Sequence, residues 1–115
     1  MNAMALARRY TGYANTYNLD GCESMFAEDM VYVSDGVGVH AGRVAIRAMM
    51  DAFFAIRPDL HWDESNYRLA GPDAVAFDFV MTGTDPVAGG PFRRVGVETI
   101  YFNPDGKIGR IEVKG

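Results

Sequence analysis

Residues 8–36 read RRYTGYANTYNLDGCESMFAEDMVYVSDG and carry the features from which the fold can be argued. Tyr13 and Tyr17 follow Tyr10 at spacings of three and seven, which puts the three phenols on one side of a helix predicted over 3–18. A buried tyrosine hydroxyl needs a hydrogen-bond partner. The stripe therefore either packs in an ordinary core with its hydroxyls at the edge, or lines a cavity.

Two further helices are predicted on either side of a short strand. Asp20 and Glu23 have the spacing of a capping box and predict the start of a short second helix. Apolar side chains crowd residues 43–57 and leave only a narrow polar stripe, so this segment predicts the clearest helix of the chain, and Pro58 ends it. A strand over 30–34 and a glycine-rich loop over 35–42 lie between the two helices.

The second half of the chain has the pattern of strands. Phe77, Phe79 and Met81 alternate with polar or smaller side chains, so they share one face of a strand. The predicted strands are 60–69, 74–83, 92–102 and 107–114, with a loop over 84–91 and a tight turn over 103–106. Helices first and consecutive strands last predict an α+β fold, in which helices cover one face of an antiparallel sheet.

Length and composition restrict the classes of function. The 115 residues predict one domain, 1–115, and 49% hydrophobic with 23% charged residues is typical of a globular protein. The net charge is -4 and no basic tract exceeds an arginine pair, so neither nucleic acid nor a membrane is an expected partner. No apolar run approaches spanning length, the N-terminus lacks a signal-peptide core, and Cys22 is the only cysteine. We expect a cytoplasmic protein.

The common catalytic motifs are absent. There are two histidines, His40 and His61, without a metal-binding spacing. The glycines at 36 and 38 do not extend into a phosphate-binding pattern, and no serine lies in a GxSxG sequence. We therefore expect no metal site and no cofactor, which leaves acid–base chemistry.

Glu98 is the residue on which that chemistry depends. It shares a strand face with Ile100 and Phe102, while Val97 and Tyr101 lie on the other face. If the face with Ile100 and Phe102 packs on the helices, Glu98 points into the core, where an ionised carboxylate is costly. It would then stay protonated or find a partner. The alternative is that the face is exposed near Glu98, or that Glu98 pairs with Arg94.

The order and spacing of three segments resemble the NTF2-like, or SnoaL-like, superfamily over essentially the whole chain. These segments are LDGCESMFAEDMVYVSDG (19–36), GRVAIRAMM (42–50) and ETIYFNPDGKI (98–108). The resemblance implies a cystatin-like cone, in which N-terminal helices pack on a curved antiparallel sheet and enclose a pocket. Within the superfamily the pattern is most similar to the ketosteroid isomerases.

This resemblance implies three catalytic residues. Tyr10 and Glu98 match the tyrosine and the protonated acid that form the oxyanion hole of those isomerases. In those isomerases an aspartate at the end of the first strand transfers the proton. Counting forward from Leu19-Asp20-Gly21 to the equivalent position reaches Ser34, and Asp35, one residue beyond, is the candidate for proton transfer. Asp35 can alternatively cap the turn before Gly36, which leaves Ser34 or Tyr32 in its place.

The resemblance also implies the remaining pocket residues. His61 and Trp62 lie on opposite faces of their strand, so only one of them points inward. The predicted substrate-binding residues are Tyr32, Ser34, Met50, Phe54, Trp62, Phe77, Phe79, Met81, Ile111 and Val113. Met50 stands where the isomerases have a supporting tyrosine.

The leading hypothesis is a cofactor-free isomerase, cyclase or dehydratase acting on a small hydrophobic molecule. The alternative is a non-catalytic binding or assembly module on the same fold. The second sheet face, with Val95, Val97 and Tyr101, is apolar enough to predict a homodimer.

Overall fold

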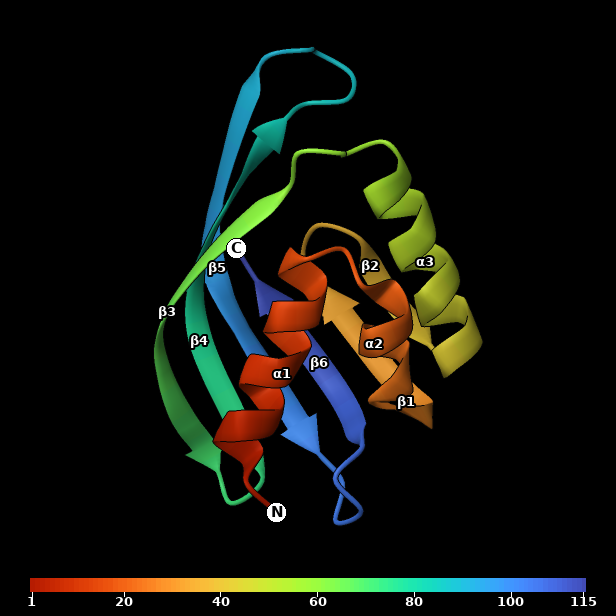
Figure 1. The fold of residues 1–115 in the computed structure, drawn as a ribbon, viewed down its shortest axis with the longest axis vertical. Helices are drawn as coiled ribbons and strands as arrows, with labels where there is room; N and C mark the ends of the chain where they lie inside the picture. The colour runs from red at the N-terminus through yellow and green to blue at the C-terminus, as the bar shows by residue number, and fades with distance from the viewer.

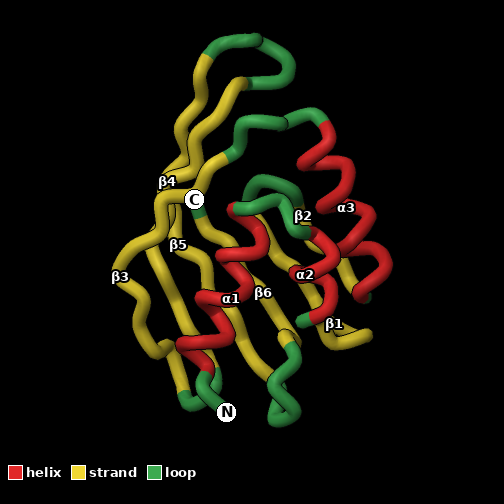
Figure 2. Tube along the Cα trace, viewed as in Figure 1, coloured by secondary structure: helices red, strands yellow, loops and turns green.

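The computed structural model describes residues 1–115, and in it three helices pack on one face of a curved six-stranded sheet (Figures 1 and 2). The helices are α1 (Ala3–Asn15), α2 (Leu19–Ser24) and α3 (Arg43–Ala55). The strands are β1 (Phe26–Ser34), β2 (Gly38–Ala41), β3 (His61–Gly71), β4 (Ala74–Thr84), β5 (Pro91–Phe102) and β6 (Ile108–Lys114). The predicted α+β cone is confirmed.

The sheet has the strand order β2-β1-β6-β5-β4-β3. Its neighbouring strands are antiparallel except for β1 and β6, which run in the same direction. The sheet is therefore mixed, whereas the sequence predicts an antiparallel one. Strands β3, β4 and β5 form a consecutive meander, but β6 inserts between β5 and β1 and so takes its direction from β5.

The helix over 3–18 ends three residues earlier than predicted. Asn2 caps the start of α1 by accepting a hydrogen bond from the backbone N–H of Ala5 (3.0 Å). After Asn15 the chain turns, and Tyr17 has a left-handed φ of 59°. Tyr17 therefore leaves the helical stripe. Its ring packs edge-on against Phe54, and its hydroxyl donates to the carbonyl oxygen of Leu60 (2.5 Å).

The predicted capping box at the start of α2 is wrong. The cap is Asn18, whose side chain accepts from the backbone N–H of Gly21 (2.9 Å). Asp20 and Glu23 instead bind Arg47 of α3, at 2.8 and 2.7 Å. An arginine fork that binds carboxylates forms stronger hydrogen bonds than a neutral backbone donor, so the two acids hold α2 against α3.

The first strand is longer than predicted, and the glycine-rich loop contains a strand of its own. β1 begins at Phe26, whose side chain is buried, and its pairing with β6 shifts register between Phe26 and Val31. β2 pairs antiparallel with β1 in register Tyr32 with His40. Gly38 adopts a left-handed φ of 84°, which lets the short turn between β1 and β2 form.

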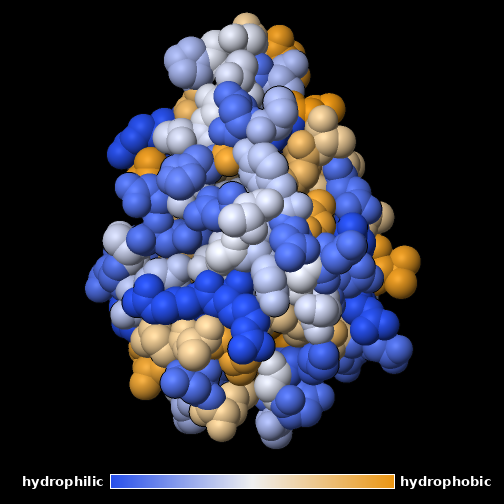
Figure 3. Space-filling view, in the orientation of Figure 1, coloured by the Kyte–Doolittle hydropathy of each residue, from blue (hydrophilic) through white to orange (hydrophobic).

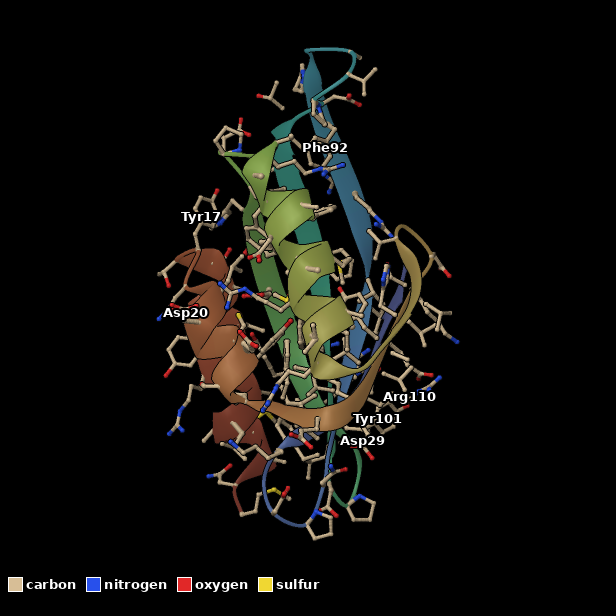
Figure 4. All side chains as sticks on the ribbon, turned by 90° about the vertical axis from the view of Figure 1, so that its right-hand side faces the viewer. Tyr17, Asp20, Asp29, Phe92, Tyr101 and Arg110 are labelled. Carbon is tan, nitrogen blue, oxygen red and sulfur yellow. The ribbon has the colours of Figure 1, made fainter.

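The two faces of the sheet differ in polarity as the alternation predicts. Ile100 and Phe102 are buried beneath the helices, whereas Val95, Val97 and Tyr101 are 52%, 36% and 37% exposed. Figure 4 shows Tyr101 on the side of the sheet away from Tyr17 and α1. The helix-side face of the molecule is mainly hydrophilic, with hydrophobic residues scattered over it (Figure 3). None of the three helices is both long and apolar enough to cross a bilayer.

Candidate functional site

A cavity of about 70 Å³, partly open to solvent, lies between the inner face of the sheet and helices α1 and α3. Twelve of its 17 lining residues are hydrophobic. The predicted residues that line it are Tyr10, Tyr32, Ser34, Met50, Phe54, Trp62, Phe79, Met81, Glu98 and Val113. The sequence therefore indicates the helix and strand faces that form the cavity.

Two predicted wall residues are buried in the core without lining the cavity. Phe77 is 1% exposed and stacks on the ring of Tyr67 with a centroid separation of 4.9 Å. Ile111 is fully buried and pairs across the sheet with Ile100. Both have the predicted inward direction, but neighbouring side chains cover them.

Asp35 lies outside the cavity, which corrects the prediction that it faces the ligand. Its side chain is exposed and accepts a hydrogen bond from the backbone N–H of Gly115 (3.1 Å), and its own N–H donates to Val113 (3.1 Å). Ser34 is the strand residue that points inward, and a one-residue step reverses the side chain. Ser34 Oγ accepts from the backbone N–H groups of Gly36 (3.1 Å) and Val37 (3.4 Å), so it caps the turn.

Two polar groups at the buried end of the cavity have no partner in the protein. Tyr10 is 5% and Glu98 is 9% exposed, and neither side-chain oxygen forms a hydrogen bond within the chain. Every side-chain nitrogen or oxygen that is completely buried has a hydrogen-bond partner. Since the side-chain oxygens of Tyr10 and Glu98 have none, they are not completely buried and must reach the cavity surface. A ligand oxygen in the cavity would therefore meet a phenol and a carboxyl that are free to hydrogen-bond.

Burial controls the protonation of both groups. Desolvation, followed by the charge of Glu64, raises the pKa of Glu98 to about 8. Glu98 does not pair with Arg94, which was one alternative for this residue. Desolvation and the proximity of Glu98 raise the pKa of Tyr10 well above its ordinary value. At neutral pH both groups carry a proton and can act as hydrogen-bond donors.

Glu64 is a second carboxyl at the cavity, and the sequence analysis missed it. It lies on β3, opposite Phe79 of β4, and its Oε1 accepts a hydrogen bond from Asn15 Nδ2 (3.3 Å). Asn15 Nδ2 also donates to the backbone carbonyl of Trp62 (2.8 Å), and Asn15 Oδ1 accepts from the backbone N–H of Trp62 (2.9 Å). These hydrogen bonds connect the end of α1 to β3. Desolvation, and then the charge of Asp63, raises the pKa of Glu64 to about 7.

The signal for Glu64 was present in the alternation of β3. Trp62 points into the cavity and His61 is exposed, which settles the choice that the sequence left open. Glu64 has the same strand parity as Trp62, so it follows inward. The other cavity residues that were not predicted are Thr11, Ala14, Val37, Met49, Phe53 and Arg94. Ala14 lies one helical turn from Tyr10, and Arg94 shares its strand face with Glu98.

The two carboxyls are suited to different tasks. Glu98 is the more deeply buried of the two and its pKa is raised further, so Glu64 ionises first as the pH rises and its charge then helps to keep Glu98 protonated. One carboxylate can then accept a proton while the neutral carboxyl and the Tyr10 phenol donate hydrogen bonds to an oxygen. The surrounding apolar walls exclude water and strengthen these interactions.

Solved structures with the same fold include proteins with bound hydrophobic molecules. A cystatin-fold protein from Novosphingobium aromaticivorans has 20% identity and a TM-score of 0.86, over 100% of this chain and 99% of that one. Rv0760c from Mycobacterium tuberculosis, in complex with estradiol-17β-hemisuccinate, has 20% identity and a TM-score of 0.82, over 98% and 92%. The epoxide hydrolase/cyclase-like enzyme SalBIII of salinomycin formation has 18% identity and a TM-score of 0.84, over 96% and 88%.

Sequence comparison assigns the chain to a family. No curated protein matches the sequence. The model of the SnoaL-like domain matches residues 7–111, which is nearly the whole chain. The match agrees with the cone fold and with the helix-covered cavity described above. This chain therefore belongs to the SnoaL-like domain family.

Proposed function

We propose that this protein is a cofactor-free acid–base enzyme of the isomerase, cyclase or dehydratase type, acting on a small hydrophobic molecule that carries a carbonyl or epoxide oxygen. The observation that carries the proposal is the convergence of two carboxyls of different pKa, Glu64 and Glu98, on one apolar cavity. A pure binding site has no need of two desolvated carboxyls, each of which is costly to ionise.

The proposed chemistry assigns a role to each group. Glu64, as carboxylate, removes a proton from a carbon beside the carbonyl and returns it to another position. Tyr10 and neutral Glu98 donate hydrogen bonds to the oxygen, on which negative charge develops. General base catalysis of this kind contributes roughly 10²–10⁴-fold to a rate. Removing one donor from such an oxyanion site costs roughly 10²–10³-fold.

The size of the cavity limits the substrate. Its 70 Å³ is about half the volume of an engineered cavity that binds benzene, roughly 150 Å³. A ring-sized substrate must therefore displace side chains, and Met49 and Met50 of α3 are the flexible ones in the lining. The same fold holds a steroid ester in Rv0760c, which shows that the architecture is compatible with a ligand larger than this cavity.

Deuterium exchange tests the proposal without knowledge of the substrate. Small hydrophobic ketones are incubated with the protein in D₂O near pH 7.5, and loss of the α-proton signal is followed by NMR. The parent should accelerate exchange, Glu64→Gln should remove the acceleration, and Tyr10→Phe should reduce it. Glu28→Gln, which changes an 89% exposed side chain on β1, is the matched control. Exchange that is equal in the parent and in Glu64→Gln would refute the assignment of the base.

A non-catalytic binding module remains the second candidate. The predominantly apolar lining of the cavity is the observation that favours it. Saturable binding of ketones by a parent protein that exchanges no protons would establish this second function.

A further inference from the structure

Arg94 is the only basic residue in the lining of the cavity, and it is half-exposed, whereas Glu98 is buried. Glu98 and Arg94 share one face of β5, four residues apart, which corresponds to roughly 13 Å between their Cα atoms. Between them is Gly96, over which the Phe79 ring packs: a Cβ at position 96 would lie 2.8 Å from Phe79 Cζ. Along this line the cavity therefore has donors at the buried end, an apolar floor, and a cation at the half-exposed end.

The guanidinium of Arg94 is held in place by one hydrogen bond, in which its Nε donates to the main-chain oxygen of Gly115. Its head lies against Gly36, where a Cβ would lie 2.8 Å from Arg94 Cζ, so the glycine provides the room that it occupies. The two terminal nitrogens donate no hydrogen bond within the protein. A charged fork with free donors at the cavity rim is suited to bind a carboxylate.

Tyr32 provides a further free donor, and it lies nearer to Glu98 than to Arg94, because it is level with Ile111 and Ile100 across the sheet. It lines the cavity, its hydroxyl has no hydrogen-bond partner in the chain, and the charge of Arg94 acts on it. Desolvation, followed by the charge of Glu98, raises the pKa of the Tyr32 phenol, so it stays protonated. The rim of the cavity thus offers a cation, and Tyr32 adds a neutral donor near Glu98 and Tyr10.

We infer that the substrate is a hydrophobic keto acid, whose carbonyl oxygen lies at Tyr10 and Glu98 and whose carboxylate binds Arg94. This inference rests on the proposed function of the same cavity, and it adds the class of the substrate and a specificity-determining residue. The acid group holds one end of the ligand at the rim and so fixes the position of the carbonyl along the apolar floor.

Two probes of the same shape test the inference by calorimetry. They are 4-oxo-4-phenylbutanoate and its neutral amide, 4-oxo-4-phenylbutanamide. At pH 6 the probe acid is ionised while the carboxyls of Glu98 and Glu64, with pKa values of about 8 and 7, are mainly neutral and do not repel it. The parent should bind the acid about tenfold more tightly than the amide, which is about 1.4 kcal/mol. The preference should shrink with added salt.

Three variants distinguish the contribution of Arg94 from a general effect of charge. Arg94→Gln should bind the two probes equally. Arg93→Gln, on the outer face of the same strand, removes the same charge and should keep the preference. Gly36→Ala keeps Arg94 but fills the space of its guanidinium, and should weaken acid binding alone. Since Gly36 does not have a left-handed φ, alanine is compatible with its backbone.

Several results would overturn the inference. These are equal binding of both probes by the parent, a preference that survives in Arg94→Gln, and no binding of either probe at millimolar concentration. Proton exchange is measured separately. A preference for the acid without proton exchange would support the ligand class and refute the catalytic function. Proton exchange without the preference would support the catalytic function and refute the ligand class.

Discussion

Glu98→Gln removes one titrating group from the cavity and keeps the shape of the side chain. The pKa of Glu98 rises from an ordinary value of 4.5 to about 8 on folding. The neutral carboxyl therefore favours the folded state fully below pH 4.5, and this advantage is lost as the pH rises through 8. At pH 7 ionisation of this carboxyl stabilises the unfolded chain by about 3 kcal/mol, whereas in the folded protein the carboxyl stays protonated. The free energy of unfolding is lower by that amount.

The variant should consequently match the parent near pH 4 and exceed it in stability at pH 7. A gain of about 3 kcal/mol corresponds to a rise of roughly 12 °C in Tm for a domain of this length. Urea unfolding and thermal melts from pH 4 to pH 9 measure the difference directly. The curve of the difference should rise between pH 4.5 and 8 and then level off.

A control of opposite sign is available on the outer face of β6. Hydrogen bonds from Tyr101 and Arg110 lower the pKa of Glu112, so its contribution is present above the unfolded pKa and lost in acid. Glu112→Gln should therefore be slightly less stable than the parent at neutral pH, by less than about 1 kcal/mol, because the site is near the surface. If Glu98→Gln behaves like Glu112→Gln, or if its difference is flat with pH, Glu98 is ionised or paired and the oxyanion hole is refuted.

Three further predictions concern residues around the cavity and the outer face of the sheet. Asp35→Asn should keep the exchange activity of the parent within about twofold, since its carboxylate lies outside the cavity; a loss above a hundredfold would return it to the mechanism. Asn15→Ala should lower the free energy of unfolding by about 2–3 kcal/mol in urea, because three hydrogen bonds are lost, and a loss below 0.5 kcal/mol would contradict this. The parent should be a homodimer by light scattering at micromolar concentration and Val97→Lys a monomer, because Val95, Val97 and Tyr101 expose an apolar strip; a monomeric parent excludes that interface.

Local alternation was sufficient to predict most of the cavity walls. Phe79 and Met81 on β4, and Glu98 with Ile100 on β5, point inward because a strand has a fixed period of two. The one-residue step between Ser34 and Asp35 shows the limit of this reasoning. The sequence gives the order of Ser34 and Asp35 along the chain. The sheet face of each side chain depends on where β1 ends and on the pairing of β1 with β6, as in Ser34 with Val113, far apart in the sequence.

Features that depend on distant partners could not be predicted. The capping box at Asp20 and Glu23 failed because Arg47, far along the chain, binds both carboxylates. The alternation of β3 indicates the inward direction of Glu64 once Trp62 is placed in the pocket, but its contact with Asn15, which spans 49 residues, has no signal in the sequence. Such contacts depend on packing, for which a single sequence has no periodic signal.

The position of β6 at the centre of the sheet has a kinetic consequence. The last strand of this chain joins the β1–β2 hairpin to the β3–β4–β5 meander, so until it inserts each half exposes a strand edge and part of the apolar core. Pairings that span nearly the whole chain make closure slow compared with hairpin formation. Folding should therefore pass its main barrier when β6 docks, and during synthesis the two open edges are exposed to aggregation until that strand has emerged.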